Sequence, residues 1–124
     1  MAVISNGETG ISVRTKLNTL FGEDLATMAW SGTIIPDISL PIIYDLTLTG
    51  NVTLGNPTGI RVGGAFGMFV NQGTGGNTMA FGAYYKFEDG TAPSLTTTSG
   101  ARDLFLAYCY DNTGVYGGLI TNIS

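Results

Sequence analysis

The stretch that decides the fold is residues 44–87, YDLTLTGNVTLGNPTGIRVGGAFGMFVNQGTGGNTMAFGAYYKF. Apolar side chains recur at every second residue in 46–49 (LTLT) and 52–54 (VTL), so each predicted strand has one apolar face and one threonine face. Glycine and Asn-Pro segments, which are typical of turns, separate these runs at 55–59 and 73–76. We therefore predict an antiparallel meander, with a hairpin that joins residues 65–70 to residues 77–81.

Strands are also predicted on both sides of this meander. Residues 26–35, which include Trp30, precede it, and LFLAYCY (104–110) follows it and turns at DNTG (111–114) into residues 115–120. Because 104–110 is apolar on both faces, we expect it and the strand at 115–120 to lie centrally. Together these patterns predict an all-β fold, a small antiparallel β-sandwich of jelly-roll or Greek-key type.

One short α-helix is predicted before the strands. Its apolar side chains fall at i, i+4, i+7 and i+8, on a helix of about three turns over residues 10–21, and they are Val13, Leu17, Leu20 and Phe21. A helix this short is marginal in water, so the stripe must pack on something. It either covers one open end of the sandwich or forms an oligomer interface in which three copies meet around an axis. We expect one domain over residues 1–124, with the helix and an arm in 1–25 and the sandwich in 26–124.

Two segments are predicted to contact a partner. The first is extended between two prolines, which lack the donor for a full strand ladder, and it lies at a sheet edge or forms an arm; it consists of Pro36, Asp37, Ile38, Ser39, Leu40 and Pro41. The second belongs to a polar, uncharged loop at 91–100, and long loops in compact domains are uncommon unless they bind something. Its predicted contact residues are Thr91, Ala92, Pro93, Ser94 and Leu95.

The charge pattern argues against a nucleic-acid partner. The formal net charge is −4, and the five basic residues are scattered, whereas phosphate binding needs clustered Lys and Arg. Charged residues make up only 11% of the chain, so its surface suits burial against other protein chains. Residues 1–7 do not resemble a signal peptide, and no apolar run approaches the ~20 residues of a membrane span. We expect folding in a cytoplasm.

Catalysis is not predicted. The chain has no histidine, which removes the commonest general base near neutral pH and the commonest metal ligand. The carboxylate pairs that a glycosidase would need are Asp45 with Asp103, or Glu88 with Asp89, but all four lie near turns or strand ends, where solvated carboxylates are ordinary. The single cysteine, Cys109, lies in an apolar run and is expected to be buried. We predict no catalytic residue, no cofactor and no metal.

Four segments in order carry a resemblance to a known group of proteins: LTLTGNVTLGNPTG (46–59), GTGGNTMAFG (73–82), YKFEDGTAPSLTTT (85–98) and DLFLAYCYDNTG (103–114). Over residues 46–117 the chain resembles a β-module of virion structural proteins of tailed bacteriophages, found in tail fibres and on head surfaces. In addition, NGETGISVRTKLNTLF (6–21) resembles a short N-terminal helical motif of phage tail proteins. The resemblance implies a structural or adhesive protein, commonly trimeric, without enzymatic activity.

We therefore predict a homotrimeric structural protein of a phage virion, made in the host cytoplasm. A capsid decoration or cement protein, which contacts the major capsid protein or other virion proteins and stabilises the head by bridging capsomers, is favoured because the chain is one small domain without a fibre shaft. The alternative is a tail-fibre or tail-tip module that binds glycans on the host surface. Its binding platform would consist of Trp30, Tyr84, Tyr85, Tyr108, Tyr110 and Tyr116.

Overall fold

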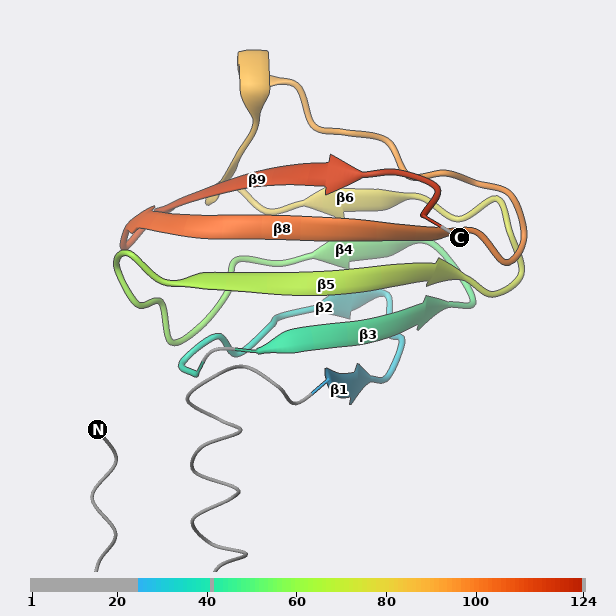
Figure 1. Ribbon diagram of the computed structural model, residues 1–124, viewed down its shortest axis with the longest axis horizontal. Coiled ribbons are helices and arrows are strands. Elements are labelled where there is room, and N and C mark those ends of the chain that lie inside the picture. The colour runs from blue at the N-terminus through green and yellow to red at the C-terminus, as the bar shows by residue number, and fades with distance from the viewer. Residues whose placement is uncertain (1–24, 41, 124) are drawn as a thin grey trace, which may run out of the picture.

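The computed structural model describes residues 25–40 and 42–123, which consist mainly of strands and their connections (Figure 1). The elements, in chain order, are β1 (Leu25–Met28), β2 (Thr33–Ile34), β3 (Ile43–Leu48), β4 (Val52–Leu54), β5 (Ala65–Gln72), β6 (Met79–Phe81), β7 (Tyr85–Lys86), the 3-10 turn η1 (Glu88–Gly90), β8 (Arg102–Asp111) and β9 (Gly114–Ile120).

The predicted all-β class is confirmed. The predicted helix over 10–21 lies outside the described residues. No helix in the described part of the chain is long and apolar enough to span a membrane.

The strands form two sheets that face each other across one core. The larger sheet has six strands in the order β1-β3-β5-β8-β9-β7, and the smaller sheet has three in the order β2-β4-β6. In Figure 1 the larger sheet lies in front of the smaller one, with β1 at the bottom and β9 near the top. The larger sheet is therefore the broader of the two layers.

The first six strands wind as a coil between the two sheets. β1, β3 and β5 each lead into a strand of the smaller sheet, and among these six strands all sheet neighbours pair in parallel. Successive corners also stack, because Gly73 N–H donates to Leu48 O at 3.0 Å and Gly82 N–H donates to Leu54 O at 2.8 Å. Each turn of the coil is thus held to the previous one in both sheets and at the corners.

The chain ends in the one hairpin that was predicted correctly. β8 pairs antiparallel with β5 on one side and with β9 on the other, and the turn closes between Asp111 and Gly114. Asp111 Oδ1 accepts a hydrogen bond from Thr113 N–H at 2.9 Å, which fixes this turn. β8 and β9 both have strand neighbours on their two sides, so their predicted central position is confirmed.

The predicted antiparallel meander is wrong for β1 to β6. Thr49–Asn51 and residues 73–78 were expected to fold the chain back on itself, but each carries it across to the opposite sheet. In the corner at residues 73–78, Gly75 and Gly76 have φ values of 86° and 73°. A hairpin turn uses glycines in the same positive-φ conformation, so the sequence does not distinguish the two. Likewise, residues 26–35 form two strands on different sheets rather than one. The jelly-roll or Greek-key form of sandwich is not confirmed, because five of the seven strand pairings are parallel.

The core lies between the two sheets and draws on alternate residues of each. From the larger sheet, Leu46, Met68 and Phe105 are fully buried, and from the smaller sheet Leu54 is fully buried and Val52 nearly so. Alternation of buried and exposed residues is clearest along β8. The period-2 pattern of the sequence therefore marks which side chains enter the core.

One buried carboxylate connects three segments at the end of β8. Asp103 is 2% exposed; its Oδ2 accepts a hydrogen bond from Thr96 N–H and its Oδ1 accepts one from Asn122 N–H, both at 2.7 Å. These bonds tie the 91–100 loop and the C-terminal residues to the larger sheet. Buried polar groups are costly unless they are paired, so Asp103 has a structural role.

We predict that Asp103→Ala lowers the free energy of unfolding by about 2–3 kcal/mol, because two backbone donors lose their buried acceptor. The measurement is urea denaturation followed by circular dichroism. Glu88→Ala, at an exposed position on η1, is the control and should change stability by less than about 0.5 kcal/mol. Equal midpoints for the two variants would contradict the assignment.

Two neighbouring glycines of β9 provide a second stability test. A Cβ on Gly117 would lie 2.6 Å from Cζ of the buried Phe105 ring, whereas a Cβ on Gly118 would have no atom within 4 Å. We expect Gly117→Ala to destabilise the fold by about 1–3 kcal/mol through overpacking. Gly118→Ala should be neutral or stabilise by up to about 1 kcal/mol, since glycine is unfavourable within a strand. Thermal unfolding of both variants measures the difference, and an unchanged midpoint for Gly117→Ala would count against it.

Candidate interaction surface

On β5, β8 and β9, the side of the larger sheet that faces away from the core is apolar. Three rows of side chains cross β5, β8 and β9 there: Ala65, Tyr108 and Tyr116; Gly67, Leu106 and Gly118; Phe69, Leu104 and Ile120. We call these nine residues, together with Tyr110 and with Ile43 on β3, the outer face. Every member is aliphatic, aromatic or glycine.

Several side chains of the outer face are open to solvent. Leu106 is 37% exposed, Ile120 and Tyr116 are each 50% exposed, and Tyr108 and Tyr110 are 64% and 70% exposed. The Tyr110 and Tyr116 rings meet edge to face at 5.5 Å, a favourable geometry for aromatic pairs. Isolated exposed apolar residues are ordinary on protein surfaces, but a continuous group of them marks an interaction site.

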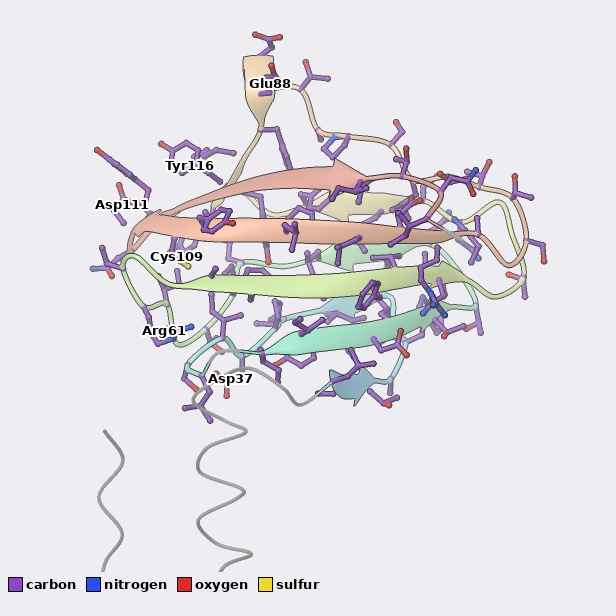
Figure 2. All side chains as sticks on the ribbon, in the orientation of Figure 1. Asp37, Arg61, Glu88, Cys109, Asp111 and Tyr116 are labelled. Carbon is purple, nitrogen blue, oxygen red and sulfur yellow. The ribbon has the colours of Figure 1, made fainter. Side chains whose placement is uncertain are left out.

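Charged groups lie at the two ends of the outer face. At one end, Arg102 Nε donates to Asn71 Oδ1 at 2.6 Å, Asn71 Nδ2 donates to Asp45 Oδ1 at 2.7 Å, and the Arg102 guanidinium lies 5.9 Å from the Phe69 ring centre. At the other end lie Lys86, next to Tyr116 across the β7–β9 pair, and Asp111 in the hairpin turn. Figure 2 shows Tyr116 and Asp111 at this same end of the sheet. Each end therefore carries one cation and one anion.

The surface has a projection beside a recess. The Leu106 side chain leans over Gly67, because its Cδ2 lies 3.3 Å from the position of a Cβ at that glycine. Beside Gly118, by contrast, is a hollow that Leu106, Tyr108, Tyr116 and Ile120 line. Gly67 and Gly118 thus make the surface of the sheet uneven, because neither has a side chain that would fill the space above it.

The first predicted contact segment is only partly available. Pro36 and Ile38 are buried, and Ile38 N–H donates to Thr58 O at 2.9 Å, which fixes the segment against the coil. Asp37, Ser39 and Leu40 are exposed, Leu40 by 55%. A hydrogen bond from Ser39 N–H at 3.0 Å lowers the pKa of the Asp37 carboxyl. Pro41 lies outside the described residues. The segment follows the surface and is not a free arm over residues 36–40.

The second predicted contact segment, residues 91–95, leads from η1 back toward β8. Thr91, Ala92 and Ser94 are exposed, Pro93 is half-buried, and Leu95 packs against the core. Farther along the same loop, Gln72 Nε2 donates to Thr96 O at 3.0 Å. Residues 91–94 thus remain open for a contact, while the following residues are tied to the sheet. The four predicted oligomer-interface residues, Val13, Leu17, Leu20 and Phe21, lie outside the described residues.

The carboxylates considered for catalysis do not form the facing pairs that were considered. Asp45 lies beside the outer face on β3, whereas Asp103 points into the core from β8, so the larger sheet separates them. Glu88 and Asp89 are both exposed on η1, and they line a hollow between η1 and the end of β9. In the described part of the chain, no group of three His, Cys, Asp or Glu side chains is arranged to hold a metal.

The aromatic platform predicted for a glycan is divided between different surfaces. Tyr108, Tyr110 and Tyr116 share the outer face, but Tyr85 is buried and its hydroxyl donates to Gly55 O at 2.8 Å. Burial, and to a smaller degree the charge of nearby Cys109, raises the pKa of the Tyr85 hydroxyl. Trp30 lies elsewhere, at the corner between β1 and β2, where its indole Nε1 donates to Gly50 O at 3.1 Å. Tyr84, directly before β7, is half-buried. Three of the six predicted platform residues, the outer-face tyrosines, therefore share one surface.

Cys109 is buried as predicted, on the inner side of β8. The loop that carries Arg61 runs alongside it, and Cys109 N–H donates to Gly64 O at 2.8 Å (Figure 2). Burial raises the pKa of the Cys109 thiol, and the hydrogen bond and charge of Arg61 offset this only in part. The thiolate is therefore disfavoured, and the residue serves as a small core side chain.

We predict that Cys109 reacts slowly with an aromatic disulfide reagent in the native protein and stoichiometrically in guanidinium chloride. A Ser99→Cys variant, at an exposed position, should contribute one rapidly reacting thiol under native conditions and so serves as the positive control. Absorbance of the released thiolate measures both rates. Rapid native labelling of the unmodified chain would show that Cys109 is accessible.

Sequence reasoning did not identify the outer face as one surface. The run 104–110 was recognised as apolar on both faces and was taken to indicate a central strand, and Tyr108, Tyr110 and Tyr116 were assigned only to a possible glycan platform. No protein-family model, curated protein or solved structure matches this chain. The resemblance of residues 46–117 to phage virion modules therefore stays a prediction, and the outer face is interpreted from its own residues.

Proposed function

We propose that this protein is a structural protein that works by binding other protein chains, and that it does so in the virion of a tailed bacteriophage. The observation that carries the first part is the outer face, a continuous apolar surface on a regular sheet with its charges at the two ends. Such a surface is costly to leave in water and suits association with protein. The resemblance of residues 46–117 supports the second part.

Within this class we favour a homotrimeric capsid decoration or cement protein. A subunit that binds only the expanded shell stabilises it by mass action, because binding shifts the equilibrium away from disassembly. Several copies attached to neighbouring capsomers add avidity without stronger individual contacts. The exposed residues of the predicted contact segments are the proposed contacts with the major capsid protein: Asp37, Ser39, Leu40, Thr91, Ala92 and Ser94.

A second function is favoured by one specific observation. Tyr108, Tyr110 and Tyr116 gather at one end of the outer face, beside Asp111. Aromatic rings with a nearby carboxylate suit a sugar, which offers an apolar ring face and hydroxyl donors. A tail-fibre or tail-tip module that binds a host-surface glycan is therefore the alternative.

The two functions differ in what the purified chain binds. We expect it to cosediment with expanded phage heads from which it has been removed, and not with host cells or a glycan array. Leu40→Asp should weaken binding to heads about tenfold or more, because a charge replaces an apolar contact at an interface. Val62→Asp is the matched control, since Val62 is 64% exposed but lies outside both contact segments.

The opposite result is equally informative. Suppose that the chain binds cells or glycans but not heads, and that Tyr108→Ala and Tyr116→Ala abolish this binding. Receptor binding would then replace decoration as the proposed function. A chain that binds neither heads, tails, cells nor glycans would contradict both.

A further inference from the structure

We propose that the outer face is a self-association surface, on which the outer face of a neighbouring copy of this chain packs. The proposed function names a homotrimer and other virion proteins as partners but does not locate the contact between copies. This inference goes beyond it, because it places that contact on the larger sheet rather than on the predicted helix at 10–21. It requires no particular location in a virion.

The distribution of side chains matches that of a protein interface. The rows that cross β5, β8 and β9 are apolar or aromatic, and the outer face includes three tyrosines, a residue type enriched at protein interfaces. Arg102, Asp45, Lys86 and Asp111 lie at the ends. Interfaces are depleted of charge at the centre and polar at the rim, so the outer face has the organisation of a surface that becomes covered.

The size of the surface corresponds to a small contact between copies. The outer face lies on four neighbouring strands, β3, β5, β8 and β9, which span about 19 Å, and along β8 it runs over residues 104–110, or about 23 Å. The product is on the order of 400 Å², about half of what each partner buries in a standard protein interface. A single helix of three turns, about 18 Å long and 10 Å wide, would cover less than half of it. The predicted helix at 10–21 would therefore leave more than half of the outer face open.

Shape and charge favour a copy of the same surface. Leu106 projects beside the hollow at Gly118, so two copies can interdigitate as the faces of packed sheets do. Each end of the outer face carries one cation and one anion. Two copies can therefore pack in either orientation without placing an excess of charges of the same sign against each other. A nucleic acid or an anionic membrane would instead require an excess of positive charge.

The test is the molar mass of the full chain in solution, measured by light scattering and sedimentation over a range of concentrations. We expect an oligomer that Leu106→Lys converts to monomer, with self-association weakened at least tenfold. Ile35→Lys is the matched control: Ile35 is 61% exposed, follows β2 of the smaller sheet, and should leave the oligomer intact. Gly118→Tyr, which fills the hollow where a Cβ meets no atom within 4 Å, should weaken association without unfolding the chain.

Circular dichroism of each variant separates loss of association from loss of fold. A monomeric unmodified chain, or an oligomer that persists in Leu106→Lys, would overturn the inference. If the unmodified chain is monomeric and removal of residues 1–24 creates a new surface that binds an apolar dye, the N-terminal segment covers the face instead, and the inference is wrong. Binding of the same variants to phage heads tests the proposed function separately, since a monomer can still bind a head and an oligomer can fail to.

Discussion

The ring of Phe105 is the contact on which the two-sheet structure depends. It projects from β8 into the core, fully buried, and its centre lies 6.1 Å from the ring of Phe66 on β5, 5.4 Å from Phe81 on β6 and 5.9 Å from Tyr85 on β7. One side chain thus links both layers. Because β8 must turn Phe105 inward, its neighbours Leu104 and Leu106 must point outward. The alternation that places Phe105 in the core therefore also places Leu104 and Leu106 on the outer face.

The sequence identified strands and faces better than it identified strand directions. The alternation around Leu46 and Leu48 gave the inner side of β3 correctly, and DNTG at 111–114 gave the closing hairpin. It could not tell that Thr49–Asn51 leads to the opposite sheet, since a corner and a hairpin turn use the same residue types. Period 2 reports which face a side chain occupies, whereas parallel or antiparallel pairing depends on contacts between residues far apart in the chain.

The candidate site was predicted less well, and for a related reason. The two prolines around residues 37–40 suggested a sheet edge or an arm, but Ile38 is buried in the core, which local composition does not reveal. Asp103 read as an ordinary solvated carboxylate, although two backbone N–H groups from distant segments surround it. When a strand is apolar on both faces, its sequence does not show whether the second face is covered by the same chain or by another chain. The outer face could not be identified from the sequence for this reason.

The coil of parallel strands also governs how the molecule reaches its folded state. Partners such as Ile43 and Gly67 are separated by a full turn of the coil, so each parallel pairing must first close a long loop, and topologies of this kind fold slowly. The only antiparallel hairpin in residues 25–40 and 42–123 is β8–β9, and it is synthesised after the coil. Until β8 leaves the ribosome, Phe66 and Phe81 lack the ring that joins them. The interior of the nascent sandwich therefore stays open until β8 and β9 are synthesised, and this is the interval in which the chain most needs protection from aggregation.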